Sequence, residues 1–201
     1  MDRYLKIARI VGWAGLASFA SLFAAWSAIL LLLAGQIKFA VIAACAAFLL
    51  DSLDGFLARR LGKASEFGRQ LDSMIDVINY SVFAALVTHQ ILLPNTLGII
   101  AGFMVLAFGV LRLILFNIDG YVADGDTLYY RGVVTCHLSL ATMIIYVVER
   151  FGVALNDWLV FGVLVVLSVG QLSTLKTRKT GALLFWIPFT LLTGIGAWFW
   201  L

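Results

Sequence analysis

Two short stretches decide how this 201-residue sequence folds: DSLDGFLAR at residues 51–59 and GRQLDSMID at residues 68–76. Together they hold four aspartates, Asp51, Asp54, Asp72 and Asp76. Residues three or four apart share one face of a helix, so each stretch places its two aspartates on a common face. A single short loop joins the two helices, so their adjoining ends must be neighbours. The spacing therefore predicts four carboxylates that converge beside a groove walled by small residues.

The composition points to lipid as the main solvent of the chain. Hydrophobic residues make up 63% of the sequence and charged residues only 12%. A typical soluble domain is about half apolar and about a quarter charged. The apolar segments leave no room for a large soluble domain, so the sequence predicts a single membrane-embedded domain over residues 1–201.

Seven segments are candidates for membrane spans, because a spanning helix needs about 20 predominantly apolar residues. They are approximately residues 10–34, 37–58, 71–93, 97–116, 132–148, 158–172 and 181–201, the last being the least certain. The sequence therefore predicts an all-α polytopic bundle of six to seven transmembrane helices. The acidic stretch at residues 119–126 does not have the spacing of an EF-hand loop and is predicted to be a solvated turn.

The basic residues indicate how the chain is oriented. With the N-terminus inside, all of the 14 Lys and Arg residues except Lys38 and Arg150 fall at inner loops or inner span ends. Cytoplasmic loops carry such an excess of basic residues. We therefore expect a multi-pass protein of the cell membrane with its N-terminus and its aspartates on the cytoplasmic side. The net charge of +3 needs no nucleic-acid partner, because such loops face anionic lipid.

Four carboxylates near the inner ends of membrane helices must be neutralised, because uncompensated charges there are very costly. Hard oxygen ligands suit Mg²⁺, Mn²⁺ or Ca²⁺, and two such ions about 3.5–4 Å apart are the arrangement used in phosphoryl chemistry. One alternative is pairing with Arg59, Arg60 and Arg69. Another is a divalent-cation transporter, although transporters usually place such sites near the midplane at interrupted helices.

Taken together, the two stretches resemble the signature of the CDP-alcohol phosphotransferases. That signature reads DxxDGxxAR, then eight residues, then GxxxDxxxD, and every fixed position is filled between residues 51 and 76. The number and order of the flanking apolar segments are also similar to that family. The resemblance therefore covers most of the chain.

The resemblance implies transfer of a phosphatidyl-type group from a CDP-activated lipid, CDP-diacylglycerol, to a small alcohol, with release of CMP. It implies that the four aspartates hold one or two Mg²⁺ or Mn²⁺ ions, and that Asp76 is the candidate general base for the acceptor hydroxyl. Gly55, Ala58 and Gly68 would let the nucleotide approach the backbone closely, and Arg59 would bind near its phosphates or pyrimidine. The family also implies a homodimer.

Residues 71–81 and the Arg112…Asn117 pair are similar to the corresponding stretches of membrane-type phosphatidylserine synthases. This similarity implies L-serine as the acceptor, with Arg112 contacting a phosphate or the serine carboxylate and Asn117 assisting. The alternative for Arg112 is extension to the membrane interface. Asn-Tyr-Ser at residues 79–81 replaces a frequent Ser-Phe-Gly, and no proline-containing turn follows Gly132. Glycerol 3-phosphate and inositol phosphate are therefore alternative acceptors.

Overall fold

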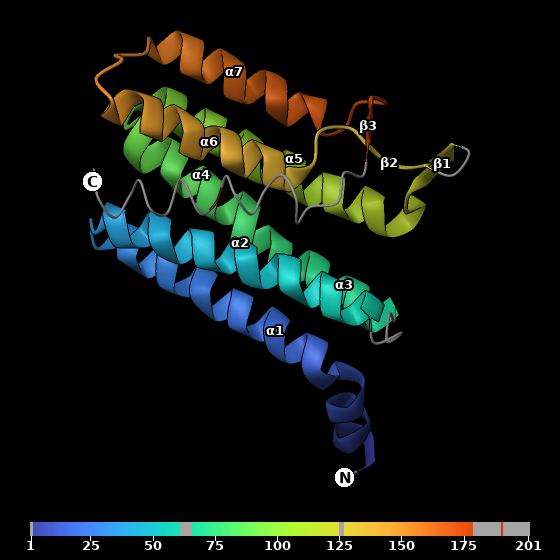
Figure 1. Ribbon diagram of the computed structural model, residues 1–201. Helices are drawn as coiled ribbons and strands as arrows, with labels where there is room; N and C mark the ends of the chain where they lie inside the picture. The colour runs from blue at the N-terminus through green and yellow to red at the C-terminus, as the bar shows by residue number, and fades with distance from the viewer. Residues whose placement is uncertain (1, 61–65, 125–126, 179–189, 191–201) are drawn as a thin grey trace. The chain divides into compact units, whose positions relative to one another are not determined.

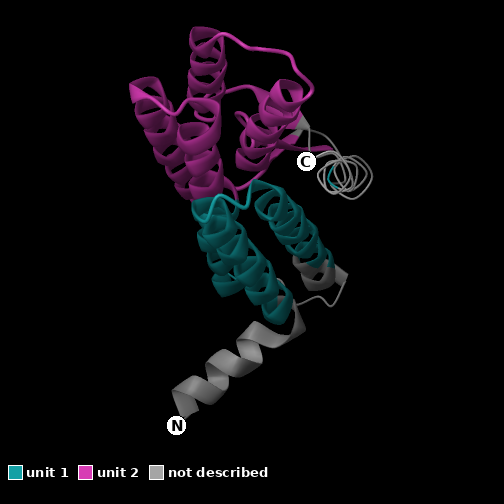
Figure 2. Ribbon diagram, turned by 90° about the vertical axis from the view of Figure 1, so that its left-hand side faces the viewer, with its two compact units in different colours: residues 1–79, 181–201 teal, residues 80–180 magenta. Residues whose placement is uncertain are grey.

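The structure is a computed structural model that describes residues 2–60, 66–124, 127–178 and 190 (Figure 1). Within these ranges, only the backbone is described for residues 2–14, 54, 57–60, 124 and 178. The chain is mostly helical, as predicted, and divides into two compact units (Figure 2). Unit 1 contains residues 1–79 and 181–201, and unit 2 contains residues 80–180.

Unit 1 is built on a helical hairpin. Helices α1 (Asp2–Leu33) and α2 (Ile37–Arg60) pack along one another, and α3 (Glu66–Asp76) packs against α1. Gly35 reverses the chain between α1 and α2 with a positive φ of 72°, a conformation that L side chains rarely adopt. Small buried residues such as Ala28 and Ala40 allow the two helices to approach closely.

The helical run from Glu66 to Leu92 is interrupted by two π-helical segments. After α3 come η1 (Val77–Val82), α4 (Phe83–Val87) and η2 (Thr88–Leu92). The run begins five residues before Leu71, where the third span was predicted to start. In π-helical turns the backbone bonds span five residues instead of four, and such turns are frequent at functional sites. The first of them follows Asp76 directly.

Unit 2 packs three further helices around a small apolar core. They are α5 (Thr96–Asp119), α6 (Thr135–Arg150) and α7 (Asp157–Gly170). Ala84, Val105 and Leu138 form the buried centre of this core. The helices α5 and α7 are capped by the asparagines that precede them, whose side-chain oxygens accept hydrogen bonds from backbone N–H groups of the first turn.

The two asparagine caps are linked to one another. The Asn95 side chain accepts hydrogen bonds from the backbone N–H groups of Leu97 and Gly98, and its Nδ2 donates to Asp157 Oδ2 at 2.8 Å. The Asn156 side chain accepts from the backbone N–H of Trp158 at 2.9 Å. These contacts fix the starts of α5 and α7 relative to each other.

Unit 2 also contains a small sheet, so the prediction of an entirely helical fold is wrong at this point. Strands β1 (Val122–Asp124), β2 (Thr127–Arg131) and β3 (Lys176–Arg178) pair antiparallel in the order β1-β2-β3. The prediction of a solvated turn at residues 119–126 is likewise wrong in part, because β1 lies there. Tyr and Thr favour strands, and Tyr130 pairs with Thr177, far along the sequence. A pairing of that kind leaves no local sequence pattern.

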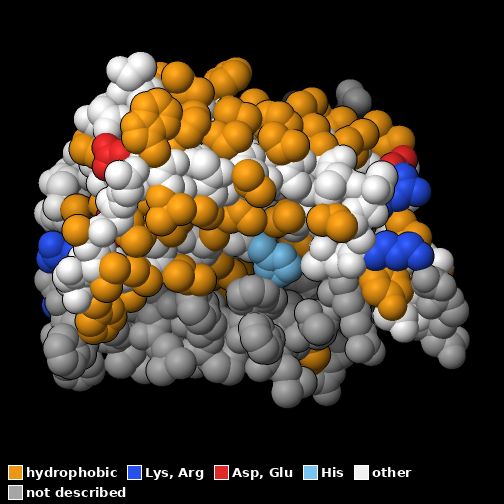
Figure 3. Space-filling model, turned by 90° about the horizontal axis from the view of Figure 1, so that it is seen from above, with side chains coloured by type: hydrophobic (Ala, Val, Ile, Leu, Met, Phe, Trp, Pro, Cys, Tyr) orange, Lys and Arg blue, Asp and Glu red, His pale blue; other side chains and the backbone are white. Residues whose placement is uncertain are grey.

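Three helices in the described part of the chain are long and apolar enough to cross a membrane: Gly15–Leu33, Glu66–Leu92 and Thr96–Asp119. A shorter apolar helix spans Asp157–Gly170. Large hydrophobic side chains are exposed along α5 and α7, for example Phe103 and Val166. Figure 3 shows a face on which hydrophobic side chains predominate and the charged ones gather toward its two ends. The seventh predicted span lies outside the described residues except for Thr190.

Candidate functional site

Three of the four predicted carboxylates come together in unit 1. Asp51 lies in α2, and Asp72 and Asp76 lie one turn apart in α3. One oxygen from each of the three side chains lies within 4.8 Å of the others, and all three residues are half-buried. The Asp54 side chain lies outside the described residues. The structure thus brings Asp51 of the first stretch close to Asp72 and Asp76 of the second, which lie 21 and 25 residues further along the sequence.

The electrostatics of this cluster favour a cation. Two unit charges within about 5 Å repel by about 3 kcal/mol at the effective dielectric constant of a site near the protein surface. Three such pairs exist among Asp51, Asp72 and Asp76. A divalent ion would convert this repulsion into attraction, and carboxylate oxygens are the ligands that hard divalent ions take.

The spacing of the oxygens fits a metal ion of this class. Metal–oxygen distances are about 2.0–2.1 Å for Mg²⁺ and about 2.3–2.6 Å for Ca²⁺, so two oxygens on one ion lie at most about 4–5 Å apart. The oxygens of the cluster lie within that range or need only a small side-chain rotation to reach it.

A buried polar bridge ties the three helices of unit 1 together next to the cluster. Asn79 Nδ2 donates to Ser21 Oγ at 2.7 Å, and Ser21 Oγ donates to the Ala47 carbonyl at 2.9 Å. Ser21 belongs to α1, Ala47 to α2, and Asn79 follows Asp76 by three residues in η1. Both side chains are buried. The bridge therefore holds the helix carrying Asp76 against those carrying Ser21 and Ala47.

For the predicted nucleotide-binding residues of the two stretches, the structure gives the position of the backbone but not every side chain. Gly55 is half-buried in α2, and Gly68 is exposed in α3. Ala58 and Arg59 belong to the last turns of α2, and their side chains lie outside the described residues. Their predicted contacts with the nucleotide stay predictions.

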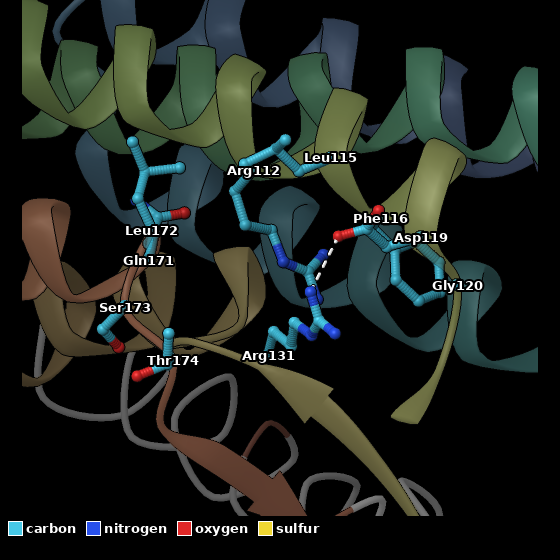
Figure 4. A pocket seen from close by; sticks show the side chains of 10 residues that line it. All are labelled: Arg112, Leu115, Phe116, Asp119, Gly120, Arg131, Gln171, Leu172, Ser173 and Thr174. Atoms are coloured by element: carbon cyan, nitrogen blue, oxygen red, sulfur yellow. Dashed lines mark hydrogen bonds and ion pairs between the residues drawn. The ribbon is translucent and has the colours of Figure 1, made fainter. Parts of the chain in front are cut away.

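A second polar region occurs in unit 2, where the sequence singled out Arg112 and Asn117. A pocket of about 130 Å³ opens between α5, β2 and the segment after α7 (Figure 4). The polar and charged residues that line it are Arg112, Asp119, Arg131, Gln171, Ser173 and Thr174. Asn117, the predicted helper of Arg112, is not among the lining residues.

Aromatic rings hold the Arg112 side chain in place. Its guanidinium carbon lies 5.1 Å from the centre of the Phe116 ring and 5.4 Å from that of Tyr130, within the range of cation–π contacts. Arg112 is only 5% exposed, so it does not extend into solvent. Burial, and then the hydrogen-bonding contact with Tyr121, raises the pKa of Tyr130, which keeps this ring neutral.

The wall formed by the segment after α7 is locked to the start of α6. The backbone N–H of Gly132 donates to the Leu175 carbonyl at 2.8 Å, and that of Val133 donates to the Gly170 carbonyl at 3.0 Å. Gly132 has a φ of 70°, and a Cβ atom there would overlap the carbonyl of Gln171. Only glycine therefore allows the chain to approach Gln171 this closely.

At the mouth of the pocket, Arg131 and Asp119 form an ion pair with a nitrogen–oxygen distance of 3.1 Å (Figure 4). Asp119 is the last residue of α5 and Arg131 the last residue of β2. Sequence reasoning missed Asp119, Gln171 and this pairing, because the sheet that brings them together was not predicted.

The comparison with known proteins identifies the family. A sequence model of the CDP-alcohol phosphatidyltransferase family matches residues 13–201, which is nearly the whole chain. The chain therefore belongs to the CDP-alcohol phosphatidyltransferase family, a family of membrane proteins that is generally metal-dependent. Among the residues that the structure describes, the three-carboxylate cluster of unit 1 is a donor set that fits such a metal.

Several curated relatives are similar to parts of the chain. The archaetidylserine synthase of Methanothermobacter thermautotrophicus is 32% identical over 116 residues, which is 56% of this chain and 50% of that protein. The CDP-diacylglycerol–serine O-phosphatidyltransferase of Mycobacterium leprae is 40% identical over 83 residues, or 41% and 28% of the two chains. That of Methanocaldococcus jannaschii is 37% identical over 75 residues, or 36% and 37%. The matching region thus spans half or less of each relative.

Proposed function

We propose that this protein transfers a phosphatidyl-type group from CDP-diacylglycerol to L-serine, releasing CMP and forming a phospholipid. The observation that carries the proposal is the cluster of Asp51, Asp72 and Asp76, formed by the two stretches that match the family signature. Curated relatives that act on serine support this acceptor. Glycerol 3-phosphate and inositol phosphate are the alternatives that the departures from the serine pattern favour.

The aspartates have distinct roles in this proposal. Asp51, Asp54, Asp72 and Asp76 hold one or two Mg²⁺ or Mn²⁺ ions, which supply charge neutralisation for the diphosphate of the CDP-lipid and for the departing CMP. Asp76 accepts the proton of the acceptor hydroxyl as its oxygen attacks the phosphorus attached to the lipid. The bond between that phosphorus and the CMP oxygen breaks, and CMP leaves with the bonding electron pair.

Other residues bind and orient the substrates. Gly55, Ala58 and Gly68 carry little or no side chain, so a nucleotide approaches the backbone of α2 and α3 closely. Arg59 contacts the phosphates or the pyrimidine. Arg112 binds a phosphate or the acceptor carboxylate, with Asn117 in support. Positioning of this kind supplies much of the rate enhancement in phosphoryl transfer.

The membrane setting completes the proposal. The chain forms one catalytic domain over residues 1–201, crosses the cell membrane six or seven times, and keeps its N-terminus and aspartates on the cytoplasmic side. It acts as a homodimer in the lipid bilayer. The distribution of Lys and Arg along the sequence supports the orientation, and the exposed apolar side chains of α5 and α7 support contact with lipid.

The proposed function is tested by CMP release from purified protein in detergent. CDP-diacylglycerol is supplied with Mn²⁺ or Mg²⁺, and serine, glycerol 3-phosphate and inositol phosphate are compared as acceptors. We expect serine-dependent release that a chelator abolishes and that added metal restores. CMP release with another acceptor would support the proposed reaction but replace serine as its acceptor. Absence of release with every acceptor, in protein that still binds Mn²⁺, would contradict the proposal and favour a cation transporter.

A further inference from the structure

The pocket of unit 2 has room for a small molecule only. Its volume of about 130 Å³ is well below the roughly 300–1,000 Å³ of pockets for drug-sized ligands. A pocket of this volume suits a small acceptor better than a nucleotide or a lipid chain. Among the acceptors considered above, serine has the fewest atoms and inositol phosphate the most.

Gln171 indicates that the occupant is polar. Its side chain lines the pocket and the residue is only 2% exposed. Neither its Nε2 nor its Oε1 has a hydrogen-bond partner within the part of the chain that the structure describes. Buried amides are nearly always hydrogen-bonded, so a group in the pocket is expected to supply an acceptor for Nε2 and a donor for Oε1.

The charges that line the pocket have both signs. The guanidinium carbon of Arg112 lies over the Phe116 and Tyr130 rings, and this buried positive charge lines the pocket, where it attracts an anionic group such as a carboxylate. Asp119 offers a carboxylate at the same pocket, where it also pairs with Arg131. In Figure 4 the Arg112 side chain extends from α5 toward the Asp119–Arg131 pair. One pocket therefore offers a partner for an anion and a partner for a cation.

We propose that this pocket recognises the acceptor as a zwitterionic α-amino acid, with Arg112 and Gln171 binding its carboxylate and Asp119 binding its ammonium group. This inference rests on the proposed function, because it names the chemistry by which the acceptor is chosen. Gln171 Oε1 accepts from the ammonium group, so a single ligand satisfies both ends of the amide. A dianionic phosphate would leave Asp119 facing a like charge.

The first test compares serine with two analogues, each of which lacks one of the two charged groups of serine. Serine, 2-amino-1,3-propanediol, which has no carboxylate, and glycerate, which has no ammonium group, are used in the CMP-release assay. We expect Arg112→Gln to raise the KM for serine by on the order of 100-fold, and to leave that for the aminodiol within about twofold. Asp119→Asn should raise the KM for serine about fivefold and spare glycerate. Arg150→Gln, an exposed charge at the end of α6, is the matched control.

The Gln171→Met variant distinguishes a role of Gln171 in serine binding from a role in stability alone. Methionine has a similar volume, and it removes the two buried polar atoms that lack partners. We therefore expect an unchanged or higher Tm together with a serine KM raised by about tenfold. A Gln171 with only a structural role would give a lower Tm and an unchanged KM. That result, or equal effects of the pocket variants on all three acceptors, would overturn the inference.

A measurement of serine binding that does not depend on CMP release tests the pocket separately from the reaction. A ligand that binds only the folded protein raises its Tm, so L-serine should stabilise the full-length protein in detergent whether or not CMP is formed. The aminodiol and glycerate should give smaller shifts, and Arg112→Gln should abolish the serine shift. CMP release with serine, but no serine shift and no effect of Arg112→Gln, would overturn the pocket while leaving the proposed function standing.

Discussion

The aspartate cluster of unit 1 and the polar pocket of unit 2 solve opposite electrostatic problems. The cluster gathers the carboxylates of Asp51, Asp72 and Asp76 from α2 and α3, and charges of one sign at this separation repel one another. The pocket gathers both signs, and the Asp119–Arg131 pair and the rings around Arg112 stabilise it without an added ion. The first region is therefore suited to a metal ion, and the second to a small organic ligand that carries its own charges.

The two regions also differ in how the chain builds them. The cluster depends on helix spacing and on the bridge between Asn79 and Ser21. The pocket depends on a three-stranded sheet and on a glycine that lets the chain pass Gln171 closely. Substitutions in unit 1 should therefore act mainly through metal binding, and substitutions in unit 2 through local structure or acceptor choice.

Loss of one carboxylate from the cluster should have the largest effect. We expect Asp72→Asn to lower both the affinity for Mn²⁺ and CMP release by at least about 100-fold, because even residues that only support metal ligands contribute about 10–100-fold. Mn²⁺ affinity is measured by electron paramagnetic resonance in the absence of CDP-lipid. Glu66→Gln, an exposed acid at the start of the same helix, is the control and should change both quantities by less than twofold. Equal losses in the two variants would argue against a metal site at the cluster.

The next largest effect is expected on the fold of unit 2. Gly132→Ala should lower the free energy of unfolding by about 2–4 kcal/mol, because alanine is strained at positive φ and its Cβ would meet the Gln171 carbonyl. At Gly152, φ is 86° but nothing lies within 4 Å of an added Cβ, so Gly152→Ala should cost only about 1–2 kcal/mol. Denaturant unfolding in detergent measures both. Equal costs would show that the approach to Gln171 does not constrain the fold.

A moderate effect is expected for the polar bridge of unit 1. Ser21→Ala leaves buried Asn79 without the acceptor of its hydrogen bond, so we expect a loss of about 1–3 kcal/mol in the free energy of unfolding. Because the bridge holds the helix that carries Asp76, Mn²⁺ affinity should also fall, by about tenfold. The control is Ser27→Ala on the same helix, because the Ser27 hydroxyl donates to the Phe23 carbonyl one turn earlier on that helix. A loss of stability with unchanged Mn²⁺ affinity would confine the bridge to a structural role.

The smallest effect is expected for the ion pair at the mouth of the pocket. Arg131→Gln should change the free energy of unfolding by less than about 1 kcal/mol, because both partners are largely exposed and such pairs are screened by water. The change should become smaller still as salt is raised. A larger, salt-independent loss would mean that the pair supports the sheet rather than the pocket.

The sequence was informative where the structure is local. The three- and four-residue spacings of the aspartates, together with a short loop, were enough to predict that both stretches meet, and the apolar runs predicted the helices of both units. The π-helical turns after Asp76 left no signal, because their bonding depends on how side chains such as Asn79 pack against α1. Asn79 lies one turn after Asp76, but nothing in the sequence indicates that its side chain donates to Ser21.

The pocket of unit 2 could not be predicted for a different physical reason. Arg112, Arg131 and Gln171 come from distant segments, which meet through the contact of α5 with α7, the hydrogen bonds of Gly132 and Val133, and the pairing of β2 with β3. A three-residue strand is too short to show alternation of polar and apolar residues. Gln171 has no distinguishing neighbours in the sequence, and its significance comes only from its burial and its unpaired amide.

The most direct test of the central claim is serine-dependent CMP release by the wild type and by Asp76→Asn, at equal amounts of protein with the same Tm. A general base contributes about 10²–10⁴-fold, and this residue also belongs to the carboxylate cluster, so we predict that the variant loses at least 10²-fold. Added Mn²⁺ should not restore it. An Asp76→Asn protein that releases CMP at the rate of the wild type would contradict the assignment of the reaction to the aspartate cluster.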